Sequence, residues 1–184
     1  MATTLLLMRD WARTIDETLF LAECNHASEA MLRDLRAIVA DTTKPATERI
    51  DELAVRLGQG RFRDDLRREF GNACAATGLT ALPVLRASHI VPWGADEDER
   101  LNPKNGLLLS ANLDALFDRY LITFDPDGKL KVSVLVTKRD QERLGPLQDL
   151  QSKPCEARAA FLRRHNTEFE RRERQRLADV AASK

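Results

Sequence analysis

The chain has 184 residues, of which 43% are hydrophobic and 32% charged. It is therefore long enough for one compact domain, and its composition excludes global disorder. Its 29 basic residues balance its 29 acidic residues, which counts against tight non-specific binding to nucleic acid. Three scattered cysteines form no C-x-x-C pair, so we expect no structural zinc site. No apolar run approaches the ~20 residues that span a bilayer, and no secretory leader is recognisable, which favours a cytoplasmic protein without membrane contact.

The first third of the chain is expected to be helical. Apolar residues recur every three or four positions over residues 4–40, with a break at 25–28 where Ser28 is the expected N-cap. A third helix is expected over 46–57 and is closed by Gly58. We treat residues 1–57 as a helical N-terminal region, and its amphipathic faces favour a surface for a homodimer.

The centre of the chain, residues 58–135, changes character and contains short elements. The expected elements are a short charged helix over 62–70, a turn at 74–78, strands over 84–89 and 107–109, a helix over 112–118, and strands over 121–124 and 129–134. The last two strands flank the letters DPDG, which favour a hairpin turn. The last region, 136–184, is expected to be helical, with interruptions at Gly145 and Pro154, and to pack on the centre.

Three polar residues of the centre have a spacing that suits hydrolysis of a phosphodiester. His89 ends a predicted strand, Asn105 lies in the loop before the next strand, and Asp114 enters a helix. A His with an unperturbed pKa of about 6.5 can deprotonate water near neutral pH, and a carboxylate can hold a divalent ion. Taken singly, each has an ordinary structural interpretation, as a bonded strand-end His, an Asn-Gly turn or a helix N-terminal acid. Their order and spacing together favour the catalytic interpretation.

The same stretch resembles a known family of nucleases. Residues 74–78 read CAATG, 86–93 read RASHIVPW, 105–109 read NGLLL and 112–118 read NLDALFD. This series resembles the HNH endonucleases, in which a ββα unit holds one metal ion. The segments GQGRFR at 58–63, LITF at 121–124 and FLRRH at 161–165 also fit, so the resemblance covers about residues 58–170.

The resemblance implies an α+β fold, with a small ββα-metal core and a β-hairpin flanked by N- and C-terminal helices. It implies His89 as general base, Asn105 as the middle catalytic residue and Asp114 as metal ligand. Asp118 is a second ligand or only a helix-surface acid. Ser88 stands where many HNH sites have a further acidic ligand, so fewer protein groups would hold the metal. One divalent ion is expected, Mg²⁺ or Mn²⁺ first, with Zn²⁺ or Ni²⁺ as alternatives.

The sequence therefore predicts a metal-dependent endonuclease that hydrolyses DNA. Four cations flank the expected site and are candidates for holding phosphates or simply for surface solubility: Arg86, Arg100, Lys104 and Arg119. One alternative is an inactive HNH-like module that binds DNA or serves as a scaffold. Another is a helical interaction protein whose basic C-terminal helix, around Arg171 and Arg176, meets a partner. Specificity would come from loops, the N-terminal helices or a partner protein, and the residues do not choose between restriction, phage defence and other roles.

Overall fold

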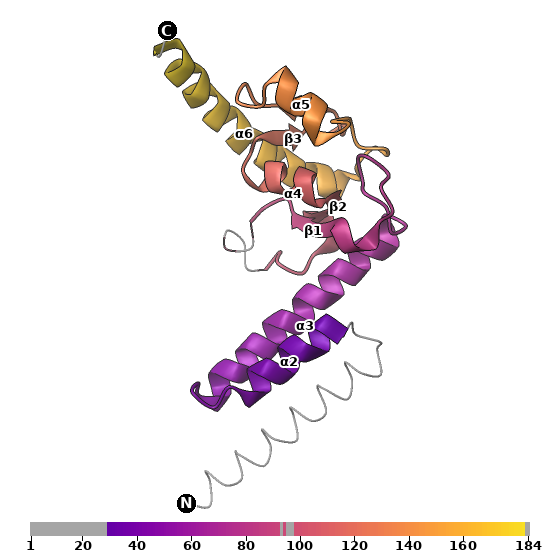
Figure 1. The fold of residues 1–184 in the computed structure, drawn as a ribbon, viewed down its shortest axis with the longest axis vertical. Helices are drawn as coiled ribbons and strands as arrows, with labels where there is room; N and C mark the ends of the chain where they lie inside the picture. Colours follow the sequence, from indigo (N-terminus) through magenta and orange to yellow (C-terminus); the bar gives the residue numbers. More distant parts are fainter. Residues whose placement is uncertain (1–28, 93, 95–97, 183–184) are drawn as a thin grey trace, which may run out of the picture. The chain divides into compact units, whose positions relative to one another are not determined.

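The structure is a computed structural model that describes residues 29–92, 94 and 98–182. The chain divides into two units, residues 1–61 and residues 62–184. The described helices are α2 (Glu29–Ala40), α3 (Ala46–Glu69), α4 (Ala111–Asp118), α5 (Lys138–Leu144) and α6 (Glu156–Ala182), and the strands are β1 (Leu85–His89), β2 (Gly106–Ser110), β3 (Ile122–Phe124) and β4 (Leu130–Val132) (Figure 1). Helices thus flank two small antiparallel strand pairs, which confirms the predicted α+β class. The three-part division at residues 57 and 135 stays a prediction.

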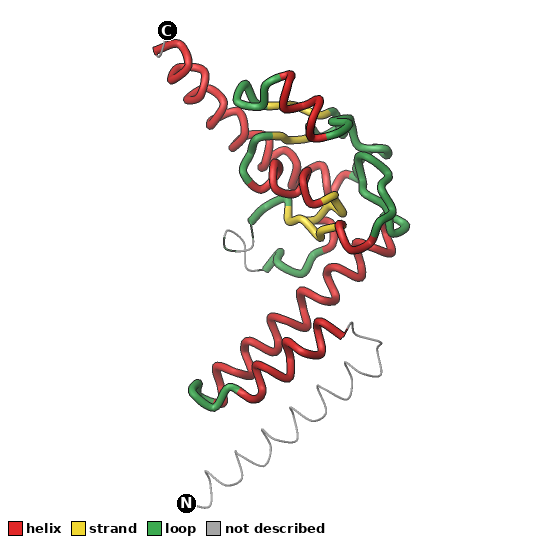
Figure 2. Tube along the Cα trace, viewed as in Figure 1, coloured by secondary structure: helices red, strands yellow, loops and turns green. Residues whose placement is uncertain are grey.

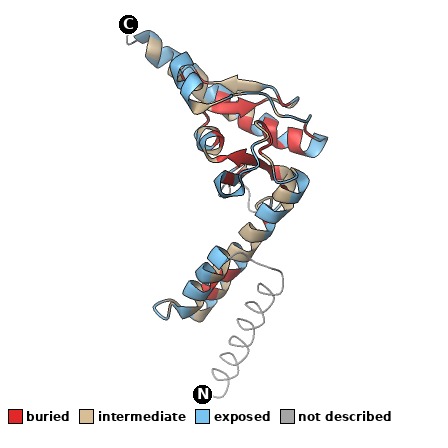
Figure 3. Cartoon of the chain, turned by 45° about the vertical axis from the view of Figure 1, so that its right-hand side comes forward, coloured by how far each residue is buried: buried red, intermediate tan, exposed pale blue. Residues whose placement is uncertain are grey.

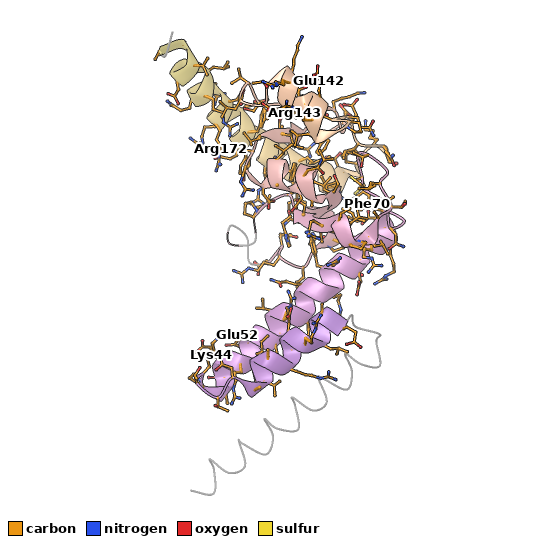
Figure 4. The ribbon with its side chains drawn as sticks, viewed as in Figure 1. Lys44, Glu52, Phe70, Glu142, Arg143 and Arg172 are labelled. Carbon is orange, nitrogen blue, oxygen red and sulfur yellow. The ribbon has the colours of Figure 1, made fainter. Side chains whose placement is uncertain are left out.

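The first unit contains α2 and the first part of α3. Leu35 and Leu53 are its buried residues, and partly buried apolar side chains surround them: Met31, Leu32, Ile38, Val39 and Leu57. A loop over residues 41–45 joins the two helices, and an ion pair links Lys44 in this loop to Glu52 on α3 (Figure 4). Residues 1–28, including the expected N-cap Ser28, lie outside the described residues.

Helix α3 corrects one prediction, because it does not end at Gly58. It continues to Glu69 and joins the two helices that were expected over 46–57 and 62–70. The close packing of Gly60 explains one of the two glycines, since a Cβ there would lie only 2.5 Å from Cε of Met31. The positive φ values that end a helix come later, at Gly71 and Asn72, both at 59°. Gly58, which was expected to end the helix, lies inside α3 instead.

The second unit contains a ββα arrangement. Strands β1 and β2 pair antiparallel, with Leu85 opposite Ser110 and His89 opposite Gly106. Helix α4 follows β2 directly and packs on both strands (Figures 1 and 2). All of β2 is buried. On the edge away from β1, the backbone N–H of Ala75, in the predicted 74–78 turn, donates to the Leu108 carbonyl at 2.7 Å. These strands and this helix confirm the predicted elements to within one or two residues.

The second strand pair confirms the predicted hairpin. Ile122 pairs with Val132 and Phe124 with Leu130. The Asp125 carboxylate accepts bonds from the N–H groups of Asp127 and Lys129, each at 2.9 Å, and Gly128 has a φ of 84° that suits glycine. Local turn chemistry therefore fixes this hairpin.

The C-terminal helices cover this core. Helix α5 begins with a capping box between Thr137 and Asp140. The two interruptions predicted at Gly145 and Pro154 are present, but the chain between them is irregular rather than helical. Helix α6 packs on β3 and buries Phe161, Leu162 and Phe169. In Figure 3 the buried residues of this unit gather on the strands and the helices against them. No helix in the described ranges is long and apolar enough to cross a membrane.

Candidate active site

His89 ends β1, a strand that has both buried and accessible side chains. Leu85 and Ser88 are buried, whereas His89 is half-buried. The Nε2 atom of His89 lies 2.9 Å from the backbone oxygen of Arg100. Because a carbonyl oxygen can only accept, Nε2 carries the ring hydrogen and Nδ1 carries the lone pair. This tautomer places the basic nitrogen of the ring at Nδ1.

The ring of Phe62 from α3 stacks on the imidazole of His89. The two centroids are 4.1 Å apart and the planes differ by 4°. Burial lowers the pKa of His89 below its usual value, against the raising effect of the Arg100 carbonyl. The ring is therefore neutral at pH 7, which is the protonation state that a general base needs.

Asn105 is buried and uses its amide group on the backbone of the loop that follows β1. Its Oδ1 accepts from the N–H of Val91 at 2.8 Å, and its Nδ2 donates to the carbonyls of Val91 and Glu99, each at 3.2 Å. Its own carbonyl accepts from the N–H of Ile90 at 3.0 Å. Asn105 thus holds the backbone directly after His89, and a direct part for its amide in catalysis stays a prediction.

Asp114 and Asp118 lie one turn apart on α4, at the i, i+4 spacing that places two side chains on one face of a helix. Asp114 is half-buried, and Asp118 is exposed. Partial burial around the Asp118 carboxylate raises its pKa, and the negative charge of Asp114 raises it further. A cation between the two carboxylates would reduce this repulsion, and metal binding by Asp114 and Asp118 stays a prediction.

The described residues offer oxygen donors that suit a divalent ion. Within the described ranges no group of three or more His, Cys, Asp or Glu side chains could hold a metal ion. Ser88, directly before His89, is 2% exposed and its Oγ has no hydrogen-bond partner in this part of the chain. Two carboxylates and an unsatisfied hydroxyl are hard oxygen donors, and Mg²⁺ accepts one or two carboxylates while it keeps several waters. The donor chemistry therefore fits one hydrated divalent ion.

The four predicted phosphate-binding cations have different surroundings. The exposed Arg86 donates to the carbonyls of Pro83 and Leu85, and the exposed Arg119 donates to Ala115. Lys104 is held in an ion pair, with Nζ 2.8 Å from Oε1 of Glu69. The backbone of Arg100 holds His89, as described above. Their contact with phosphate stays a prediction, and Lys104 is already engaged by Glu69.

Arg158 is a buried residue that sequence reasoning missed, because it was grouped with the basic C-terminal segment. Its Nε donates to the carbonyl of Gly106 at 2.9 Å, and its two terminal nitrogens lie 2.9 and 3.0 Å from the carboxylate oxygens of Glu69. It also donates to Pro103 at 2.9 Å. These bonds to Arg158, more than the Lys104 pair, lower the pKa of Glu69 to about 2. Nothing in the local sequence separates Arg158 from its exposed neighbours, whereas Phe62 lay within the GQGRFR segment.

The basic end of α6 is largely paired within its own helix. Arg171 and Arg172 pair with Glu168, and Arg176 pairs with Glu173. Arg172 also lies over the ring of Tyr120, 4.1 Å from its centroid (Figure 4). These contacts reduce the charge that the helix offers to a partner.

A ββα unit with a neutral His at the end of its first strand and two acids on its helix defines a nuclease-type module. Residues 74–125 match the family model described as HNH endonuclease. The match over residues 74–125 confirms the predicted resemblance to the HNH endonuclease family. No curated protein shows significant similarity to the chain.

Proposed function

We propose that this chain is a metal-dependent endonuclease that hydrolyses phosphodiester bonds of DNA. The observation that carries the proposal is the state of His89. The Arg100 carbonyl fixes its hydrogen on Nε2, and burial keeps the ring neutral. A neutral imidazole with its lone pair on Nδ1 can accept a proton from water.

In the proposed reaction His89 Nδ1 takes a proton from a water molecule whose oxygen attacks phosphorus. One new P–O bond forms, the scissile P–O bond breaks, and the leaving oxygen carries away the electron pair. Asp114 and Asp118 would hold the divalent ion, Mg²⁺ or Mn²⁺ first. When bound, such an ion neutralises charge on the phosphate and stabilises the leaving oxygen. Asn105 holds the loop backbone behind the base, and Arg86, Arg100, Lys104 and Arg119 would face the DNA.

The first experiment incubates supercoiled plasmid with the wild-type protein in Mg²⁺, in Mn²⁺ and in EDTA. The variants are His89→Ala, Asp114→Asn and a matched control, Asp127→Asn, whose carboxylate is 66% exposed in the β3–β4 turn. We expect wild type and Asp127→Asn to nick the plasmid only with a divalent ion. We expect His89→Ala to be inactive and Asp114→Asn to require more metal. Equal cutting by wild type and His89→Ala would refute the assignment of the base.

The alternative is an inactive HNH-like module that binds DNA or serves as a scaffold. It draws on the lack of a three-ligand cluster among the described residues and on the zero formal charge. Intact plasmid under each divalent ion, together with DNA binding in a gel-shift assay, would favour this alternative.

The proposal includes a homodimer formed through the N-terminal helices, which would allow paired cuts on both strands. Sedimentation at high protein concentration tests this point, and a monomer would remove it. A cytoplasmic location and a partner protein that supplies specificity also remain parts of the proposal.

A further inference from the structure

The last two turns of α3 pack against the point where His89 of β1 lies opposite Gly106 of β2. Phe62, Leu66 and Glu69 are spaced by four and three residues, so they share one face of the helix. Phe62 stacks on the His89 ring. A Cβ on Gly106 would lie 2.5 Å from Cζ of Phe62 and 2.8 Å from Cδ1 of Leu66. Gly106 has a φ of −147°, so contact with α3, rather than backbone conformation, accounts for a glycine here.

An ion pair between the buried Arg158 and the partly exposed Glu69 ties the end of α3 to the strand opposite His89. Glu69 from α3 holds the Arg158 guanidinium with two bonds, and Arg158 donates to the Gly106 carbonyl. Arg158 also lies over Phe70, with its Cζ 4.9 Å from the ring centroid. Helices α3 and α6 are thus both tied to Gly106, whose strand partner is His89.

A histidine ring at a strand end is not fixed by its backbone. The second side-chain torsion of histidine has broad minima, so the ring can rotate about the Cβ–Cγ bond. The bond to the Arg100 carbonyl restrains one atom of the ring, while a parallel neighbour at 4.1 Å restrains its plane. The two contacts together set which nitrogen carries the lone pair and where it points.

We propose that Phe62 is a positioning residue for His89, which it holds in the plane where Nε2 donates to Arg100 and Nδ1 acts as the base. The inference rests on the proposed function for its catalytic consequence, but its structural half can be measured without DNA. The competing explanation is that Phe62 only fills the core.

The structural half is tested by NMR of the histidine side chains in the full-length protein. The variants are Phe62→Leu, Phe62→Met, which keeps more of the volume, and the matched control Phe70→Leu; His89→Gln identifies the His89 signals. In wild type and Phe70→Leu we expect ring ¹⁵N shifts of a single Nε2–H tautomer and His89 ring protons shifted upfield by the stacked ring. In the folded Phe62 variants we expect that upfield shift to be lost and the two tautomers to average. An unchanged tautomer and unchanged ring protons in both would overturn the proposal.

The catalytic half is tested by plasmid cleavage with the same variants. We expect kcat to fall about 10- to 100-fold in the Phe62 variants with KM for DNA unchanged, because a small misplacement of a base costs rate rather than binding. Phe70→Leu should stay within a few-fold of wild type. If wild type cuts, His89→Ala does not, and the Phe62 variants cut normally, the positioning role fails while the nuclease stands. If wild type does not cut, the proposed function fails and the NMR result still decides the positioning.

Discussion

Two histidines of the second unit, His165 and His89, have the same side chain but differ in exposure. His165 on α6 is 3% exposed and lies between two rings, with centroids 3.9 Å from Phe117 and 4.3 Å from Tyr120. Its Nε2 is 3.2 Å from the Phe117 carbonyl, so Nε2 carries the hydrogen and Nδ1 accepts from the Thr123 hydroxyl at 2.8 Å.

His89 is half-buried at a strand end, and its Nε2 donates to Arg100. Burial lowers the pKa of both rings, for His165 to about 4. A ring whose two nitrogens are both engaged inside the core joins α4, β3 and α6, and it cannot exchange protons with water at a substrate. The comparison separates a structural histidine from a candidate base by the exposure of the ring, not by residue type.

The largest expected effect is a difference in DNA cleavage between variants of the two histidines. His89→Ala should reduce DNA cleavage by about 10²- to 10⁴-fold, the usual contribution of a general base, and should leave the protein folded. His165→Gln should destabilise the fold because it removes two stacked contacts, while cleavage per folded molecule stays near wild type. Plasmid nicking and urea unfolding of both variants measure this difference. Loss of cleavage in folded His165→Gln, with His89→Ala active, would reverse the two roles.

The next effect concerns the ion pair of Arg158 with Glu69, which supports the strand opposite His89. Arg158→Met removes the partner of a partly buried carboxylate and of two carbonyls, which should lower the free energy of unfolding by about 3 kcal/mol, with the partial exposure of Glu69 limiting the loss. Arg163→Met on the same helix breaks an exposed pair with Glu156 and should cost less than about 1 kcal/mol. Urea unfolding compares the two variants. Similar values would show that the buried network is no stronger than a surface pair.

A smaller effect is the dependence of stability on pH. Below its ordinary pKa of 6.5 the unfolded His165 binds a proton that the folded ring, with a pKa of about 4, does not. Stability is therefore fully present above about pH 6.5 and is lost as pH falls toward 4, by about 2 kcal/mol between pH 7 and pH 5. The difference in unfolding free energy between wild type and His165→Gln should shrink by that amount. A constant difference would mean that His165 is not buried in its neutral form.

The smallest expected effect is on the pH dependence of cleavage, which reports the pKa of His89. A base must be neutral, so cleavage should fall as pH falls through the pKa of His89. Because burial lowers that pKa below 6.5, the acid limb of the rate profile should have its midpoint below pH 6.5. The profile of kcat/KM against pH, at saturating metal, measures it. A midpoint well above 6.5 would point to another titrating group.

Local sequence patterns predicted most of the second unit. The strand with His89, the helix that starts near Asn112 and the hairpin around Asp125 and Gly128 follow from propensity and turn chemistry. The order of His89, Asn105 and Asp114 was enough to indicate the family. Helix α3 was divided wrongly at Gly58, because a glycine after a helical pattern is typical of a helix end, whereas α3 continues to Glu69. The neighbouring Gly60 serves a contact with Met31, which is distant in the chain and leaves no local signal.

The sequence by itself determined the elements and the motif of this protein, since both depend on residues that are near each other in the chain. Only the tertiary structure decided which side chains support the site. Arg158 reaches Glu69 across 89 residues, and His165 reaches Thr123 across 42. Phe62 on a helix stacks on His89 at the end of a strand. No local pattern encodes such pairs, because they form only when packed elements bring distant residues together and exclude water from them.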